Sequence, residues 1–134
     1  EFRRVLFRSE FGSGVKKGGK KLSDIDRVPA FWPDHPTVRT DLLDYAYEVE
    51  SFDAHLGRML AALEQRGLLD HTLVIVTSDH GTWRYGKTTL YEGGLKVPLV
   101  MRWPSGIRPG LNYPHLVLNT DYAATLLDLA GADR

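Results

Sequence analysis

The strongest constraint on the fold is a long stretch in which apolar residues recur at intervals of three and four. These residues are Leu42, Tyr45, Val49, Phe52, Leu56, Met59 and Leu63. Because an α-helix turns about every 3.6 residues, the side chains share one helical face. Thr37 or Thr40 can cap the start, and Gly67 can end the helix in the left-handed conformation. The sequence therefore predicts an amphipathic helix over residues 37–66.

A buried strand is predicted soon after this helix. Residues 72–77 (TLVIVT) form an apolar run rich in β-branched side chains, which is typical of a strand covered on both faces. A second strand is predicted over residues 97–103, ended by Pro104. A last helix is predicted over residues 121–129, with Gly131 as its terminator. The alternation predicts an α/β fold with a mostly parallel or mixed sheet flanked by helices.

The composition is that of an ordinary globular chain. There are 134 residues, with 17 Lys+Arg against 17 Asp+Glu, no Cys and 43% hydrophobic residues. These values exclude a disordered chain, a collagen-like repeat and a disulfide scaffold. Nucleic-acid binding relies on a surplus of Lys and Arg, so we expect no nucleic-acid partner. The apolar runs are too short for a transmembrane segment.

The N-terminal residues need separate treatment. Residues 1–9 (EFRRVLFRS) match the translation of GAG TTC AGA CGT GTG CTC TTC CGA TCT, which resembles a common sequencing-library adapter. We interpret them as an adapter-derived artefact outside the fold. Removing their three Arg and one Glu leaves 14 Lys+Arg and 16 Asp+Glu. Residues 10–27 contain the stretch GSGVKKGGKK and are predicted to form a flexible loop.

Four of the five histidines lie next to or near an aspartate, and their positions distinguish them. Three are interpreted as surface or capping residues: His35, His55 and His71. Asp79 and His80 differ, because they follow the carboxyl end of the predicted strand 72–77, where open α/β sheets bind ligands. Carboxylate oxygen and neutral imidazole nitrogen both ligate divalent cations. Asp79 and His80 are thus candidate metal ligands, with a structural turn at Gly81 as the alternative.

Lys87 has three interpretations. Residues 81–88 (GTWRYGKT) satisfy the P-loop pattern G-x-x-x-x-G-K-S/T, which cradles nucleotide phosphates. The acidic Asp79 before the loop, its bulky aromatic residues and the nearby Pro98 disfavour this interpretation. In the second, the Lys87 ammonium faces a metal-bound oxyanion beside Asp79. In the third, Lys87 is an ordinary solvated lysine.

A series of short motifs follows the first predicted strand. The motifs are Ser78-Asp79-His80-Gly81, Gly86-Lys87, Leu90-Tyr91-Glu92-Gly93-Gly94, Val97-Pro98-Leu99 and Arg102-Trp103-Pro104. This order resembles the later part of the catalytic domain of type I sulfatases, in the alkaline phosphatase superfamily. The likeness covers roughly residues 28–132. It is strongest to the heparan N-sulfatase-like branch.

The resemblance implies an alkaline-phosphatase-like fold, incomplete here, in which residues 28–134 form the later part of the catalytic domain. The parent protein would hydrolyse sulfate esters or sulfamates of a small molecule or glycan. Asp79 and His80 would bind a divalent cation, usually calcium in this family, and Lys87 would be the catalytic lysine that contacts the substrate sulfate. The family also implies an exported or periplasmic location.

The resemblance places the nucleophile outside this chain. Sulfatases of this type use a formylglycine made from Cys or Ser in the motif C/S-x-P/A-x-R. The sequence has no Cys, and none of its serines stands in that motif. We therefore expect the nucleophile in a preceding part of the protein and an inactive 134-residue fragment. A phosphoesterase of the same superfamily, a P-loop nucleotide-binding module and a non-catalytic binding domain remain as alternatives.

Overall fold

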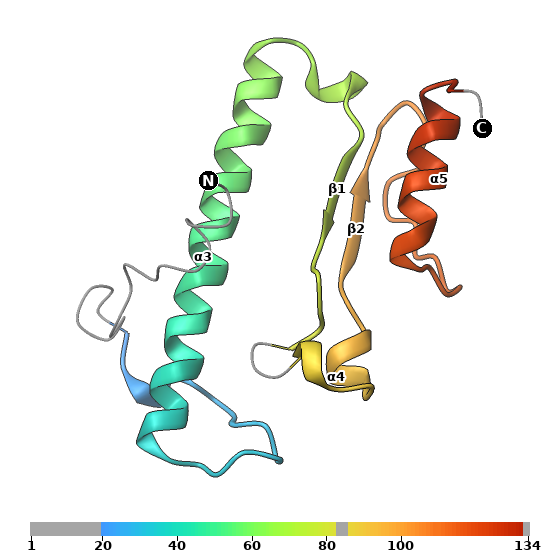
Figure 1. The fold of residues 1–134 in the computed structure, drawn as a ribbon. Coiled ribbons are helices and arrows are strands. Elements are labelled where there is room, and N and C mark those ends of the chain that lie inside the picture. Colours follow the sequence, from blue (N-terminus) through green and yellow to red (C-terminus); the bar gives the residue numbers. More distant parts are fainter. Residues whose placement is uncertain (1–19, 83–85, 133–134) are drawn as a thin grey trace.

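A computed structural model describes residues 20–82 and 86–132 of the chain (Figure 1). Its elements, in order, are the 3-10 turn η1 (Leu22–Asp24), α3 (Pro36–Gln65), the 3-10 turn η2 (Leu69–His71), β1 (Val74–Thr77), the 3-10 turn η3 (Gly86–Thr88), α4 (Glu92–Leu95), β2 (Leu99–Arg102) and α5 (Asn119–Leu129). Figure 1 shows the two strands between α3 on one side and α5 on the other. Residues 1–9, interpreted as adapter-derived, lie outside the described residues.

The long helix α3 confirms the helix predicted from the apolar periodicity, to within a residue at each end. Its N-cap is His35, whose Nδ1 accepts a hydrogen bond from the backbone N–H of Thr37 at 3.2 Å. The predicted caps, Thr37 and Thr40, were therefore wrong. A proline at the first helical position is favourable, since its missing N–H would have no partner there, and the cap falls on the preceding residue. Gly67 has φ +67°, the left-handed conformation predicted for it.

The chain leading into α3 is tied to the helix by Arg39. The Arg39 guanidinium forms a two-pronged ion pair with Asp34, with Nε to Oδ1 at 2.5 Å and Nη2 to Oδ2 at 2.8 Å. Its Nη1 donates to the carbonyl oxygens of Leu22 and Ile25, at 3.2 and 2.8 Å. The Arg39 hydrogen bond holds the pKa of the Asp34 carboxyl below its usual value, although desolvation opposes this. The predicted loop over residues 10–27 thus includes residues that are hydrogen-bonded to α3.

The strands β1 and β2 pair antiparallel, with Val76 opposite Val100. A mostly parallel or mixed sheet was predicted; this pair is not parallel, and two strands do not test whether the sheet is mixed. An apolar run reports that a strand is covered on both faces, but it carries no information on the direction of its neighbour. The described part of the connection includes only the short helix α4 rather than a long crossover helix, so the chain returns antiparallel.

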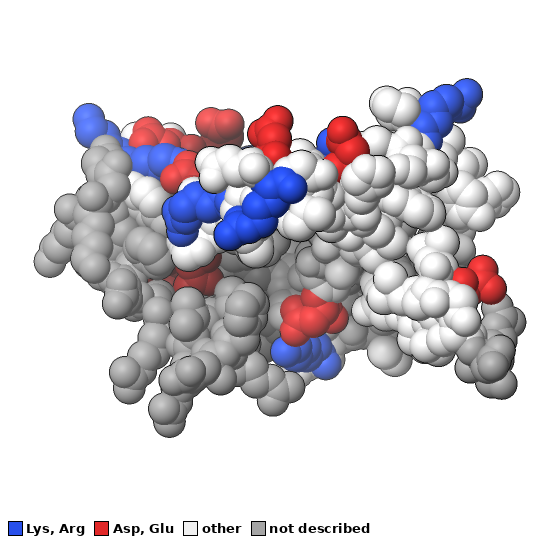
Figure 2. Space-filling model, turned by 90° about the horizontal axis from the view of Figure 1, so that it is seen from above, with Lys and Arg blue, Asp and Glu red and all other residues white. Residues whose placement is uncertain are grey.

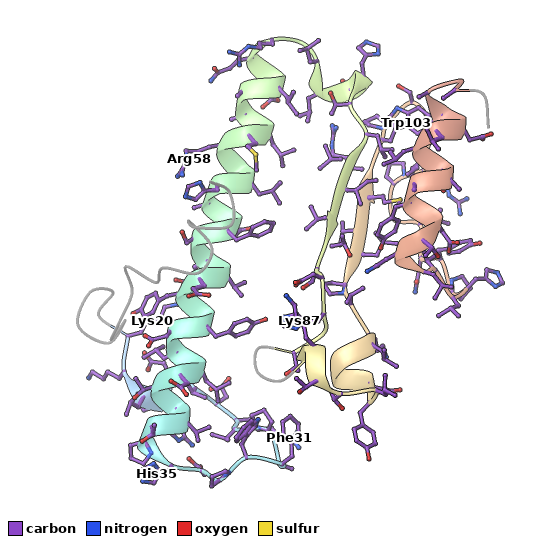
Figure 3. The ribbon with its side chains drawn as sticks, in the orientation of Figure 1. Lys20, Phe31, His35, Arg58, Lys87 and Trp103 are labelled. Atoms are coloured by element: carbon purple, nitrogen blue, oxygen red, sulfur yellow. The ribbon has the colours of Figure 1, made fainter. Side chains whose placement is uncertain are left out.

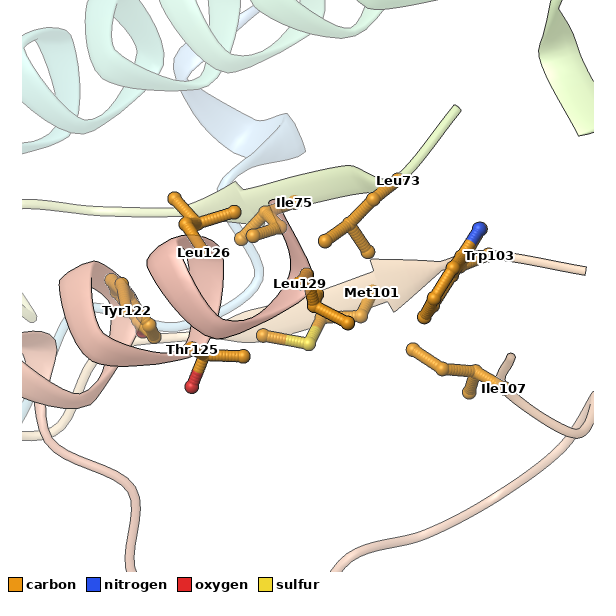
Figure 4. Close-up of a pocket in the computed structure, with 9 residues that line it drawn as sticks. All are labelled: Leu73, Ile75, Met101, Trp103, Ile107, Tyr122, Thr125, Leu126 and Leu129. Atoms are coloured by element: carbon orange, nitrogen blue, oxygen red, sulfur yellow. The ribbon is translucent and has the colours of Figure 1, made fainter. Parts of the chain in front are cut away.

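One face of the strand pair packs against α5. The helix begins two residues earlier than predicted, because the Asp121 carboxylate accepts a hydrogen bond from the Leu118 N–H at 2.8 Å. It ends at Gly131 (φ +65°), as predicted. A small, partly open apolar pocket of about 210 Å³ lies between the helix and the strands (Figure 4). Its lining residues are Leu73, Ile75, Met101, Trp103, Ile107, Tyr122, Thr125, Leu126 and Leu129.

The apolar stripe of α3 remains largely open. Within residues 20–82 and 86–132, Leu43 is the only hydrophobic residue that is fully buried, with 1% of its surface exposed. Four stripe residues are about half exposed: Tyr45, Val49, Phe52 and Met59. Val100 of β2 is 62% exposed. This much open apolar surface is typical of a face that another segment covers.

The charged residues do not gather by sign on the face shown in Figure 2. Described Lys and Arg side chains there are interspersed with Asp and Glu side chains. Among the described helices, none is long and apolar enough to cross a membrane.

Candidate functional site

Asp79 and His80 lie in a turn directly after the carboxyl end of β1. The Ser78 hydroxyl closes this turn by donating a hydrogen bond to the carbonyl oxygen of His80 at 2.8 Å. Figure 3 shows Lys87 at the same end of the structure, where β1 meets α4. The chain after β1 therefore folds back so that all three predicted site residues lie together.

The charged contact within this cluster joins Lys87 to Asp79. The Lys87 Nζ lies 2.8 Å from Asp79 Oδ2, and the two side chains are 62% and 66% exposed. The hydrogen bond from Lys87 lowers the pKa of the Asp79 carboxyl, and desolvation opposes it in part. The carboxylate is thus held in its charged form by a neighbouring ammonium. Such an exposed ion pair adds little to the stability of the fold, so it matters mainly for the charges at the candidate site.

His80 presents its two ring nitrogens to different surroundings. Nε2 lies 3.7 Å from Asp79 Oδ1, and the side chain is 26% exposed. Nδ1 is buried and has no hydrogen-bond partner in the described structure. Nε2 is therefore the nitrogen on the same side as the Asp79 carboxylate.

Glycines allow the backbone segments around the turn to touch. A Cβ on Gly81 would lie 2.2 Å from the Lys96 carbonyl oxygen, and one on Gly94 would lie 2.5 Å from the carbonyl oxygens of Gly86 and Thr89. Gly81 also donates its backbone N–H to the Gly94 carbonyl at 3.2 Å. A glycine is thus required at position 81 because the Lys96 carbonyl approaches its backbone closely. The left-handed conformation is not the reason, since the φ of Gly81 is not positive. This role of Gly86 and Gly94 was not predicted from the sequence, although the repeated glycines within residues 81–94 were a signal for it.

The pair of Asp79 and His80 fits two ligands of a divalent cation but not a whole site. Calcium ligands lie about 2.3–2.6 Å from the ion. If two of them make a right angle at the ion, their two ligand atoms are about 3.3–3.7 Å apart. The separation of Asp79 Oδ1 from His80 Nε2, 3.7 Å, is at the upper end of that range. Calcium takes about six to eight ligands, whereas the described residues contain no cluster of three or more His, Cys, Asp or Glu. Further ligands would have to come from elsewhere.

The other three histidines that have an aspartate nearby in the sequence do not join this cluster. His35 caps α3, and His55 and His71 are exposed at other positions in the fold. Their interpretation as surface or capping residues agrees with these positions.

Comparisons with known proteins agree with the motif series. The family model described as Sulfatase matches residues 10–132. N-acetylglucosamine-6-O-sulfatase of Bacteroides thetaiotaomicron is 36% identical over 95 residues, which are 67% of this chain and 17% of that protein. An ulvan-active sulfatase of Formosa agariphila is 35% identical over 117 residues, 83% of this chain and 22% of that protein. Human arylsulfatase A is 39% identical over 93 residues, 60% of this chain and 18% of that protein.

The chain spans about a fifth of the length of these curated relatives. The relatives do not single out the heparan N-sulfatase-like branch, which stays a prediction. The family match covers nearly the whole chain, including β1, the Asp79 turn and Lys87. The chain belongs to the sulfatase family.

Proposed function

We propose that this chain is part of a hydrolase of sulfate esters or sulfamates and that it carries part of the metal and sulfate site. The observation that supports this most is the cluster of Asp79, His80 and Lys87 at the end of β1, in a chain of the sulfatase family. The named relatives are sulfatases of glycans and other compounds, so a sulfated glycan or small molecule is the proposed substrate.

Asp79 and His80 would hold the divalent cation, with calcium as the ion expected in this family. When bound, such a cation supplies positive charge that polarises a sulfate oxygen and activates the nucleophile. The two residues contribute a hard carboxylate oxygen and an imidazole nitrogen, and the fit described above concerns only these two ligands.

Lys87 would bind an oxygen of the substrate sulfate. An ammonium group has three N–H donors, and in this structure the Asp79 carboxylate accepts one of them. The remaining donors can bind an anion, and Lys87 is exposed enough to be reached. Asp79 then has a second role, because its charge orients the ammonium toward the cluster.

The rest of the active site would come from segments outside these 134 residues. The formylglycine nucleophile is expected there, since no serine of this chain stands in the required motif. The antiparallel pair would form part of a larger mixed sheet in an alkaline-phosphatase-like domain. The open stripe of α3 and the exposed Val100 support this proposal, because more elements are needed to cover them.

The test begins with the coding sequence upstream of residue 10 at the source locus. We expect an Asp-Asp pair followed by C/S-x-P/A-x-R in the same frame. The full reading frame should hydrolyse an aryl sulfate or an N-sulfated glucosamine. Lys87→Ala should reduce kcat/KM about 10²–10³-fold, whereas Lys96→Ala, which changes an exposed lysine of the same loop, should have little effect.

Two results would contradict the proposal. Hydrolysis of phosphate monoesters without hydrolysis of sulfate would favour the phosphoesterase alternative. Sulfatase turnover by the purified 134-residue chain would show that the nucleophile lies within it.

The P-loop alternative gains no support, because Lys87 lies in a 3-10 turn and the next described helix, α4, has only 4 residues. A P-loop lysine instead stands at the start of a helix whose amides bind phosphate.

A further inference from the structure

We propose that Gly86 is a positioning residue for His80, which it holds so that Nε2, and not Nδ1, is the nitrogen offered to the cation. Gly86 acts through its lack of a side chain, because the imidazole occupies the space that a Cβ would fill. The part that concerns the cation rests on the proposed function. The part that concerns the ring position does not.

The contact between Gly86 and the imidazole is close on several atoms at once. A Cβ on Gly86 would lie 2.3 Å from Nδ1, 2.9 Å from Cγ and 3.1 Å from Cε1 of His80. Real Cβ atoms essentially never lie closer than 3.0 Å to a non-bonded heavy atom, so the first two distances are clashes and the third is a very tight contact. All three atoms belong to one rigid ring, so no small rotation at the end of a flexible chain removes the clash. Any side chain at position 86 must displace the imidazole or the turn.

Gly86 has no room to move away from the ring. It is buried, and its carbonyl oxygen lies where a Cβ on Gly94 would be 2.5 Å away. The Gly94 backbone is held in turn, because its carbonyl accepts the N–H of Gly81 at 3.2 Å. The ring of His80 therefore packs on the backbone of Gly86, and the backbone of Gly86 packs on that of Gly94. We call this arrangement the stack.

The stack makes the two ring nitrogens unequal. Nδ1 is buried against Gly86 and, within the described structure, has no hydrogen-bond partner. Nε2 lies 3.7 Å from Asp79 Oδ1 on the partly exposed side of the ring. A neutral imidazole ligates through one nitrogen while the other carries the proton. Because a cation cannot reach Nδ1, the geometry leaves Nε2 as the ligating atom.

The first experiment reads the ring position without metal, in the full 134-residue chain labelled with 15N-histidine. We expect nuclear Overhauser contacts between the His80 ring and the Gly86 Hα protons. Gly86→Ala should shift the His80 ring resonances. Gly93→Ala is the matched control in the same loop, since among the described residues a Cβ there would meet nothing closer than Thr82 at 3.9 Å, and it should leave the ring resonances unchanged.

A thermal-unfolding cycle keeps the test decisive if Gly86→Ala perturbs the whole fold. Gly86→Ala should lower Tm in the chain with His80 and should lower it much less in a His80→Ala background, because the clashing ring is then absent. An equal loss of Tm in both backgrounds would overturn the proposal. Absence of the contacts between Gly86 and the ring would overturn it as well.

The second experiment uses 113Cd²⁺ as the probe for the ligating nitrogen. We expect coupling between cadmium and Nε2 of His80 in the native chain and in Gly93→Ala, with affinity reduced about tenfold or more in Gly86→Ala. Coupling to Nδ1 would overturn the assignment while leaving the metal site in place. If cadmium does not bind His80 but the ring still packs on Gly86, the metal role in the proposed function fails and the positioning role stands.

Discussion

The loop after β1 is packed backbone against backbone, whereas α3 presents an apolar stripe that is about half exposed. In the loop, Gly81, Gly86 and Gly94 all touch groups that belong to the same stretch of sequence, residues 80–96. In α3, a Cβ on Gly57 would meet nothing within 4 Å among residues 20–82 and 86–132. The geometry of the site is therefore encoded in one short stretch of sequence. The covering of α3 depends on segments far away in the chain or outside it.

The largest difference between the loop and α3 is expected when one methyl group is added to each. Gly94→Ala places a Cβ 2.5 Å from two backbone carbonyl oxygens, which cannot rotate away, and should destabilise the chain by about 3 kcal/mol. Gly57→Ala lies inside α3, where a Cβ would contact no other described residue, and should stabilise the chain by about 0.5–1 kcal/mol. Urea unfolding measures both. Similar effects of the same sign would show that the loop is not tightly packed.

The second test compares a buried and an exposed residue of α3. Leu43→Ala removes the fully buried side chain and should cost about 2–3 kcal/mol in the free energy of unfolding. Phe52→Ala, at a residue 46% exposed, should cost less than about 1 kcal/mol. If Phe52→Ala proves to be the more costly change, the stripe is already covered in the 134-residue chain, for example by self-association.

A smaller effect is expected at the start of α3. Arg39→Lys removes the two-pronged contact with Asp34 and the hydrogen bonds to the carbonyls of Leu22 and Ile25. Amide hydrogen exchange near these carbonyls should accelerate, by less than about tenfold because the ion pair is exposed. Exchange near the C-terminal end of α3 should not change. Faster exchange along the whole helix would mean that Arg39 supports α3 itself.

The smallest effect concerns the pH dependence of the site. Because Lys87 lowers the pKa of Asp79, the ion pair contributes above the unfolded-state pKa of the carboxyl and is lost as the pH falls through the lower folded-state pKa. Lys87→Met should raise the pKa of Asp79 and leave that of Asp34 low. A carboxyl 13C NMR titration reads both groups. An unchanged pKa of Asp79 would show that the contact with Lys87 is not kept in solution.

The local elements were predictable because their signals lie close together in the sequence. The apolar spacing predicted α3, and Gly67 and Gly131 ended helices as expected. The position of Asp79 and His80 after the strand β1 was also predictable, since a strand run and the polar residues after it are adjacent, although β1 is only partly buried here. The direction of β2 was not predictable, because a run such as residues 72–77 reports burial and not the orientation of a partner.

The amino-acid sequence alone was enough to predict the helices α3 and α5, the strand that precedes the site and the motif series typical of sulfatases. The contact of Lys87 with Asp79 and the antiparallel pairing of β1 and β2 became known from the three-dimensional structure. The structure also shows that Gly86 faces the ring of His80. The physical reason is that periodicity and end signals act over a few residues. Contacts of 2–4 Å between separate segments depend on how the backbone folds back, and no local propensity specifies that path.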